Sequence, residues 1–262
     1  MYTPTEMILL RSGVATGAAM LGAGVGASVK NIAHSTLCGM VSLAAGALLA
    51  VTAIHVLPEA AASMAATPLA GWLLTALSTG AGLAAFFLVG KYVYYMCPAC
   101  AATASERQEG YLRLGVLMIV TLALHATMDG LAIAAGYQQH DAVLGALILI
   151  AVSYHKVPEG LALVSVCRLA GWSRTRSVLT TLAVELSTAL GAFVGMRALN
   201  GAPPLVLGLT LGFIAGSFLY TVGFATLKEM LEHERSSIVV YALLGAGSIV
   251  VVQFALAGLH IS

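Results

Sequence analysis

Residues 142–166 read AVLGALILIAVSYHKVPEGLALVSV, an apolar run interrupted near its middle by one histidine, one lysine and one glutamate. A helix that crosses a bilayer needs about 20 predominantly apolar residues, and this run is long enough. An ionisable side chain at such depth costs at least about 2.5 to 3.5 kcal/mol, so each is a functional hypothesis by default. The segment therefore predicts a membrane helix with a site inside it.

The rest of the chain repeats the pattern of long apolar runs. Of its 262 residues, 60% are hydrophobic and 9% are charged, whereas a soluble domain carries about 25% charged residues. The polar connections are too short to hold a soluble domain, so we expect an all-α polytopic membrane protein with residues 1–262 forming one transmembrane domain. The apolar runs predict eight spans, at roughly 7–29, 36–57, 69–94, 112–136, 142–166, 178–197, 205–226 and 238–258.

The cationic residues predict an orientation for these spans. Of the 12 Lys and Arg residues, nine lie in or beside the odd-numbered loops, two lie on the side of the termini, and Lys156 lies inside the fifth span. Positive loops face the cytoplasm, so we expect cytoplasmic odd-numbered loops and both termini outside. The net charge of +1 and the absence of a basic patch argue against nucleic-acid binding.

Spans four and five each carry a histidine followed four residues later by a carboxylate. Span four holds His125 and Asp129, and span five holds His155 and Glu159. Residues four apart lie on one helical face, so each helix presents an imidazole and a carboxylate in the same direction. Packed together, the two helices would form a four-ligand site with a charge of about −2, which suits a divalent cation.

The donor types narrow the choice of cation. Imidazole together with carboxylate suits Zn²⁺ and also accepts Fe²⁺, Mn²⁺, Co²⁺ or Cd²⁺, whereas Ca²⁺ and Mg²⁺ prefer oxygen alone. We expect this metal to be a transported substrate and expect no cofactor. Gly130 and Gly160 follow the two carboxylates and predict a close approach of spans four and five. Pro158 predicts a kink in span five.

These motifs resemble those of the ZIP (Zrt/Irt-like protein) divalent-metal transporters. Residues 125–130 look like the family's fourth-span motif and residues 155–160 like its fifth-span motif. Residues 55–60 resemble its second-span signature, and residues 217–221 followed by 229–231 resemble its seventh-span signature. The resemblance implies spans 1–3 and 6–8 as inverted repeats around central spans 4 and 5. It also implies elevator-like alternating access toward the cytoplasm, and it suggests a homodimer. The metal ligands that it implies are His125, Asp129, His155 and Glu159, with Glu185 of span six as a peripheral ligand or charge partner.

Lys156 departs from the family's pattern. Members with a second metal position have an acidic or amide residue at this place, whereas an ammonium opposes a second dication by charge. We therefore predict one metal per site. Lys156 would replace the second metal as a tethered cation, paired with Glu159 three residues on or with Glu185 across the helix interface.

Two further pairs leave alternatives open. His55 and Glu59 repeat the four-residue spacing at the end of span two, where they predict either a metal-capture site on the outer side or a helix-end cap or packing group. Cys97 and Cys100 lie at the cytoplasmic end of span three. One such pair supplies half of a structural zinc site, so the cysteines are either a release site or ordinary reduced thiols.

The leading hypothesis is a secondary transporter, not an enzyme, that imports Zn²⁺ or a related cation into the cytoplasm. A passive divalent-metal channel is the nearest alternative. An intramembrane metalloprotease would show an HExxH motif, which the chain lacks. A retinal-binding protein would use Lys156 for a Schiff base, but the 7% of aromatic residues, with none clustered around this lysine, argue against a ring-binding pocket.

Overall fold

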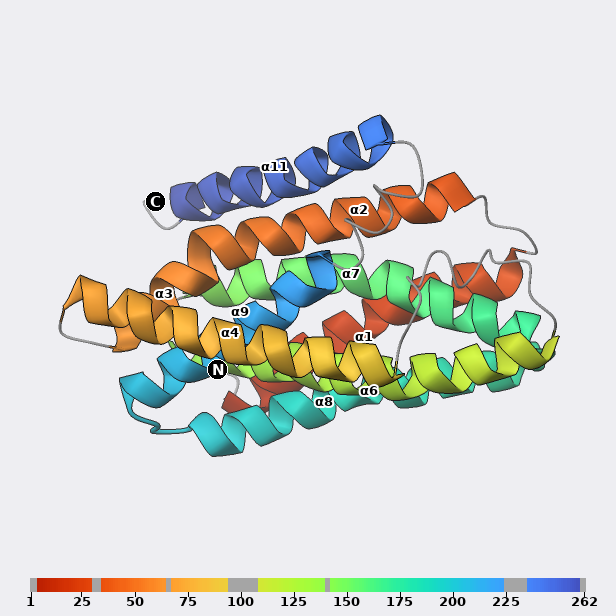
Figure 1. The fold of residues 1–262 in the computed structure, drawn as a ribbon, viewed down its shortest axis with the longest axis horizontal. Coiled ribbons are helices and arrows are strands. Elements are labelled where there is room, and N and C mark those ends of the chain that lie inside the picture. Colours follow the sequence, from red (N-terminus) through yellow and green to blue (C-terminus); the bar gives the residue numbers. More distant parts are fainter. Residues whose placement is uncertain are drawn as a thin grey trace.

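The computed structural model describes residues 4–29, 34–64, 67–93, 108–139, 142–223 and 235–259. Within these ranges the chain forms helices and no strand. The elements are α1 (Pro4–Ser28), α2 (His34–Val51), the π-helical turn η1 (Thr52–Val56), α3 (Leu57–Met64), α4 (Pro68–Val93), α6 (Gln108–Gln138), α7 (Ala142–Leu169), α8 (Arg174–Leu199), α9 (Pro204–Val222) and α11 (Arg235–Leu259). Figure 1 shows them running along the long axis of the molecule.

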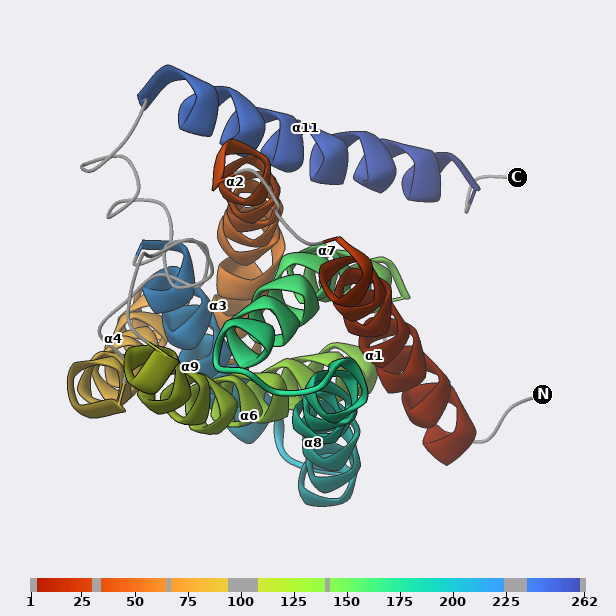
Figure 2. The same cartoon turned by 90° about the vertical axis from the view of Figure 1, so that its right-hand side faces the viewer.

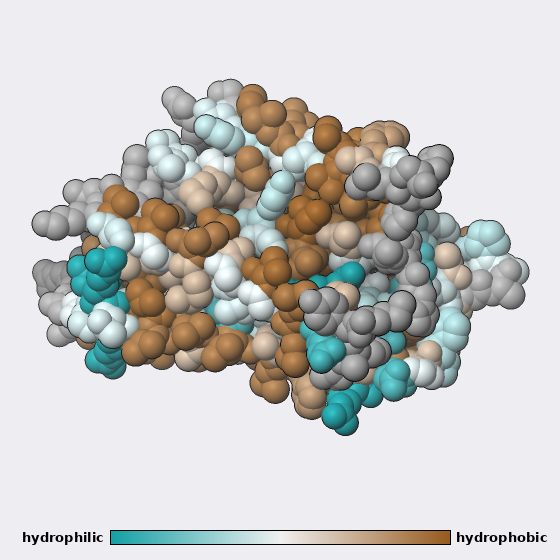
Figure 3. All heavy atoms as spheres, turned by 180° about the vertical axis from the view of Figure 1, so that it is seen from behind, coloured by the Kyte–Doolittle hydropathy of each residue, from teal (hydrophilic) through white to brown (hydrophobic). Residues whose placement is uncertain are grey.

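Eight stretches of the described residues are long and apolar enough to cross a membrane. They are Glu6–Ser28, Cys38–Met64, Pro68–Lys91, Gly115–Gln138, Val143–Leu169, Arg174–Leu199, Pro204–Val222 and Ser237–Gly258. The prediction of an all-α polytopic membrane protein with eight spans is therefore confirmed. Large apolar side chains such as Leu21, Leu77 and Phe254 are more than two-thirds exposed, as lipid-facing residues are. Figure 3 shows hydrophobic side chains over much of one face, with hydrophilic ones gathered toward its two ends.

Span two extends past its predicted end at residue 57, because the helix continues through Pro58 instead of ending there. Pro58 has no N–H to donate within the helix. The preceding turn widens into η1, in which the Leu57 N–H donates to the Thr52 carbonyl oxygen. The helix then continues to Met64, which places His55 and Glu59 inside the span rather than at its end.

The helices associate in two groups, each built from two closely packed pairs. In the first group α1 packs on α7 and α8 packs on α6, and α1 also contacts α8. In the second group α2 packs on α11, α4 packs on α9, and α3 contacts both α4 and α9. Figure 2 shows α7 lying between α1, α2 and α6, with α11 at the periphery. The window of α7 that would cross the membrane is 72% buried, against 17% for α11, so α7 is the central helix.

The four pairs follow the pattern that the predicted repeat requires. Exchanging spans one to three with spans six to eight, and span four with span five, turns the α1–α7 pair into the α8–α6 pair. The same exchange turns the α2–α11 pair into the α9–α4 pair. This correspondence concerns packing partners, and the inverted repeat itself stays a prediction.

Glycines let the site helices contact their outer neighbours at the level of the backbone. A Cβ added to Gly130 would collide with the Thr188 carbonyl oxygen of α8, and one added to Gly160 with the Ala19 carbonyl oxygen of α1. The prediction that these glycines bring spans four and five together is therefore wrong. Each glycine lies about 100° around the helix from the preceding carboxylate, so it faces an outer helix while the carboxylate faces the centre.

α7 runs as one helix from Ala142 to Leu169 with Pro158 inside it. The predicted kink is thus not accompanied by a break in the helix. The uninterrupted helix keeps His155 and Glu159 on successive turns of one element, which is the condition for their side chains to share a face.

Candidate metal site

Four buried side chains converge between α6 and α7. His125 and Asp129 come from α6, and His155 and Glu159 come from α7. Each offers one ligand atom, and these atoms all lie within 4.8 Å of one another. Both pairs lie near the middle of their candidate spans, so the group lies at mid-depth in the bundle. The structure brings together all four residues that the sequence proposes as primary ligands.

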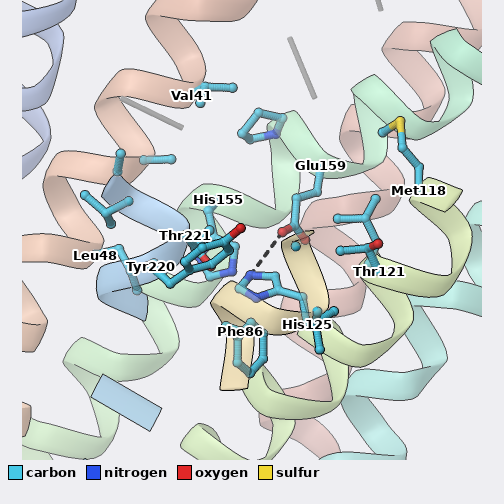
Figure 4. A pocket seen from close by; sticks show the side chains of 17 residues that line it. Val41, Leu48, Phe86, Met118, Thr121, His125, His155, Glu159, Tyr220 and Thr221 are labelled. Atoms are coloured by element: carbon cyan, nitrogen blue, oxygen red, sulfur yellow. Dashed lines mark ion pairs between the residues drawn. The ribbon is translucent and has the colours of Figure 1, made fainter. Parts of the chain in front are cut away.

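The pairs are arranged crosswise between the two helices. The Nε2 atom of His125 lies 3.2 Å from Oε1 of Glu159, and the Nε2 atom of His155 lies 3.2 Å from Oδ2 of Asp129. The contact within the α6 pair is longer, at 3.7 Å between His125 Nε2 and Asp129 Oδ1. Figure 4 shows the His125 ring turned toward Glu159 of the neighbouring helix. The site is therefore shared by α6 and α7, and neither helix forms it alone.

The hydrogen bonding of His155 leaves a lone pair facing the site. Its Nδ1 atom lies 3.1 Å from the Ala151 carbonyl oxygen, which only accepts hydrogen bonds. In the neutral ring Nδ1 therefore carries the hydrogen, and Nε2 presents its lone pair to Asp129. This is the way in which metal-ligating histidines are commonly oriented.

Two polar atoms of the cluster have no hydrogen-bond partner. His125 Nε2 and Asp129 Oδ1 are both buried and unpaired by hydrogen bonds. Such orphaned atoms are uncommon in folded proteins and call for an explanation, such as a bound ion. A cation among these four residues would satisfy the lone pairs that now face one another.

Lys156 lies next to the cluster and is fully buried. Its Nζ atom is 2.9 Å from Asp129 Oδ2, 2.9 Å from Glu159 Oε2 and 3.0 Å from Glu185 Oε2. Both ion pairs predicted for Lys156, with Glu159 and with Glu185, are thus present. The contact with Asp129 was missed, because it depends on how α6 and α7 are rotated against each other, and residue spacing carries no signal for that rotation.

Glu185 of α8 contacts the site through Lys156. It is fully buried, and it is not among the four residues whose ligand atoms converge. Its contact with Lys156 is the one that the charge-partner role predicts, and both proposed roles stay predictions. With neutral histidines, the three carboxylates and one ammonium leave a net charge of about −2, which one dication would neutralise.

A cavity of about 120 Å³ leads away from the cluster. Its lining includes His125, His155 and Glu159 of the cluster, and Phe86, Thr121 and Tyr220 beyond it. These residues come from both helix groups, and those beyond the cluster lie in the helix halves that lead to the odd-numbered loops. On the other side of the cluster, a core of buried apolar residues fills the space, including Leu147, Ile148, Ala151, Leu211 and Ile214. The cavity therefore lies on the odd-loop side of the cluster.

The other predicted site residues have different surroundings. His55 is half-buried, and its Nε2 atom lies 3.2 Å from Oε1 of Gln253 on α11. Glu59 accepts a 3.4 Å hydrogen bond from Ser63. Among the described residues, neither belongs to a group of three or more potential metal ligands, so their capture role stays a prediction. Cys97 and Cys100 lie outside the described residues.

Comparison with known families agrees with this geometry. A family model described as ZIP Zinc transporter matches residues 100–253, which include both motifs and Glu185. The chain belongs to the ZIP zinc transporter family. Among curated proteins, no sequence matches it. ZIP membership and the eight apolar helices make it an integral multi-pass membrane protein of a divalent-metal transport family, and the family's members are transporters rather than enzymes.

Proposed function

We propose that this ZIP protein is a secondary transporter that imports Zn²⁺ into the cytoplasm through a single site between α6 and α7. The observation that carries the proposal is the buried group of two imidazoles and two carboxylates at mid-depth in the bundle. Zn²⁺ takes nitrogen and oxygen ligands and prefers four of them. Cd²⁺, Fe²⁺, Mn²⁺ and Co²⁺ are the competing substrates.

The position of Lys156 supports one metal per transport event. Its ammonium contacts both carboxylate ligands and Glu185. A second dication bound by these carboxylates would lie against this buried positive charge, at a separation where like charges repel strongly. Lys156 thus holds the place of a second metal.

The cavity supports alternating access. The charge distribution favours cytoplasmic odd-numbered loops, and in this orientation the cavity faces the cytoplasm while the packed apolar core separates the cluster from the outside. The described conformation would then be the inward-facing one, from which metal is released. Import requires a second conformation in which the apolar core opens instead.

The close glycine contacts, which lie within each of the two helix groups, support an elevator-like movement of one group against the other. Wherever an added Cβ on a described glycine would have a neighbour within 4 Å, that neighbour belongs to the glycine's own group. At Gly22, Gly46, Gly82, Gly130 and Gly160 the nearest neighbour is a backbone carbonyl oxygen, so these helices pack closely within their group. The metal cluster belongs to the first group and faces the second across the cavity. We expect α1, α6, α7 and α8 to move as one body against the other helices.

Metal flux into proteoliposomes tests the proposal. Purified protein is reconstituted, and uptake of Zn²⁺, Cd²⁺, Fe²⁺, Mn²⁺ and Co²⁺ is followed with and without an opposing gradient. We expect saturable uptake, with the highest kcat/KM for Zn²⁺. Uptake that rises linearly with concentration, at rates far above typical carrier turnover, would favour the channel alternative. The absence of any metal-dependent flux would contradict both.

A further inference from the structure

Lys156 contacts one oxygen atom of each of the two carboxylates proposed as ligands. Its Nζ atom contacts Oδ2 of Asp129 and Oε2 of Glu159, each at 2.9 Å. The other oxygens, Oδ1 of Asp129 and Oε1 of Glu159, lie 3.7 Å and 3.2 Å from His125 Nε2, and Oδ1 of Asp129 has no hydrogen-bond partner. Oδ2 of Asp129 also lies 3.2 Å from His155 Nε2. One oxygen of each ligand is therefore engaged by the ammonium, and one remains for a metal.

The ammonium is fixed in this position. A lysine ammonium has three N–H donors, and Lys156 has three carboxylate neighbours within 3.0 Å, the third being Glu185 of α8. The side chain is fully buried, so water cannot replace a lost contact. Releasing either ligand oxygen would leave a buried charge with one partner fewer, which is strongly unfavourable.

This division of oxygens leaves four ligand atoms for a metal. They are Nε2 of His125, Nε2 of His155, Oδ1 of Asp129 and Oε1 of Glu159. Aromatic rings flank the histidines, since Phe86 packs near His125 and Phe218 near His155, each at 6.4 Å between ring centroids. These flanking rings add no metal-binding side chain to the four.

We infer that Lys156 is a specificity-determining residue that holds both carboxylates monodentate and so makes the transport site four-coordinate. This inference rests on the proposed function, because it concerns the same site. A tetrahedral set of two nitrogens and two oxygens suits Zn²⁺. Mn²⁺ prefers octahedral oxygen-rich sites, and Ca²⁺ takes six to eight ligands, often from bidentate carboxylates. Lys156 selects against these larger coordination numbers.

Co²⁺ is a direct probe of coordination number, since four-coordinate Co²⁺ has intense visible d–d bands and six-coordinate Co²⁺ has weak ones. We expect intense bands when Co²⁺ is added to the purified wild-type protein in detergent. In Lys156→Met the freed oxygens allow bidentate binding, so the bands weaken. The ratio of Mn²⁺ to Zn²⁺ affinity then rises by at least about tenfold, which is about 1.4 kcal/mol.

Two further variants separate this role from a general loss of structure. Glu185→Gln removes an equally buried carboxylate but keeps the contacts of Lys156 with both ligands, so the intense bands should persist. If Lys156→Met does not fold, Lys156→Met combined with Glu185→Gln removes a positive and a negative charge together and should show the same weakened bands.

The outcomes distinguish the inference from the proposed function. Wild-type protein that binds Co²⁺ with weak bands overturns the inference and leaves metal transport standing. Lysine variants that keep intense bands and the wild-type Mn²⁺ to Zn²⁺ ratio overturn it as well. Wild-type protein that binds no Co²⁺ and moves no Zn²⁺ overturns the proposed function, and the inference falls with it.

Discussion

The chain places a carboxylate four residues after a histidine three times, yet within the described residues only two of these pairs meet in a group that could hold a metal ion. The pairs of α6 and α7 are buried and face each other. The pair of span two, His55 and Glu59, is half-buried and contacts Gln253 and Ser63 instead. The four-residue spacing places a histidine and a carboxylate on one helical face, but a four-residue group also requires a second helix with another such pair at the same depth.

The residue that follows each carboxylate also differs between the two central pairs and the pair of span two. Glycine follows Asp129 and Glu159, but Ala60 follows Glu59. The two glycines allow the outer helices α8 and α1 to pack backbone to backbone on the site helices. The pair of span two has no such glycine and lies in the other helix group, away from α6.

Removing either central histidine should have the largest effect. We expect His125→Ala and His155→Ala each to lower saturable Zn²⁺ uptake into liposomes by more than about 100-fold, because each deletes one of four ligands. Equal losses would show that the two pairs contribute alike. Saturable uptake that survives in either variant would contradict the assignment of the site.

Replacing the two glycines that follow the carboxylates by alanine should destabilise the fold. Gly130→Ala and Gly160→Ala each place a Cβ against a backbone carbonyl oxygen, and we expect each to lower the free energy of unfolding by about 1 to 3 kcal/mol. Gly24→Ala is the matched control, since nothing lies within 4 Å of its added Cβ. Thermal melting in detergent measures the difference. Equal melting temperatures for Gly24→Ala and Gly160→Ala would argue against backbone packing at α1 and α7.

Neutralising the charge partner should have a smaller effect. Glu185→Gln leaves Lys156 paired with Asp129 and Glu159 and reduces the negative charge of the site by one. We expect Zn²⁺ affinity, measured by titration calorimetry, to fall by about tenfold or less, corresponding to about 1.4 kcal/mol. A loss as large as that of His155→Ala would instead make Glu185 a metal ligand.

Replacing His55, of the pair in span two, should have the smallest effect on stability and transport. His55→Ala removes one contact between span two and α11, and interhelical hydrogen bonds in membranes contribute about 0.6 kcal/mol on average. We expect a slightly lower melting temperature and an unchanged KM for Zn²⁺. Gln253→Ala removes the same contact from the other side and serves as the control. A several-fold rise in KM in His55→Ala alone would support the capture site.

Hydropathy was sufficient to predict the eight spans, because a bilayer-crossing helix must be apolar over its whole length. It failed at the end of span two. Pro58 is compatible with either a helix end or a widened turn, and the choice of η1 and a continuing helix to Met64 depends on packing of α3 against α4 and α9. The same holds for Gly130 and Gly160, whose partners are residues of helices distant in sequence.

Composition and the helical period were sufficient to predict the membrane fold, the four candidate ligand residues and their pairing on two helices. Three features follow from the packing of the helices instead: the pairs cross between α6 and α7, Lys156 contacts Asp129 as well as its two predicted partners, and the cavity lies on one side of the cluster. The reason is physical. The rotation and depth of one helix against another are set by contacts between residues far apart in the chain, and no local pattern encodes them.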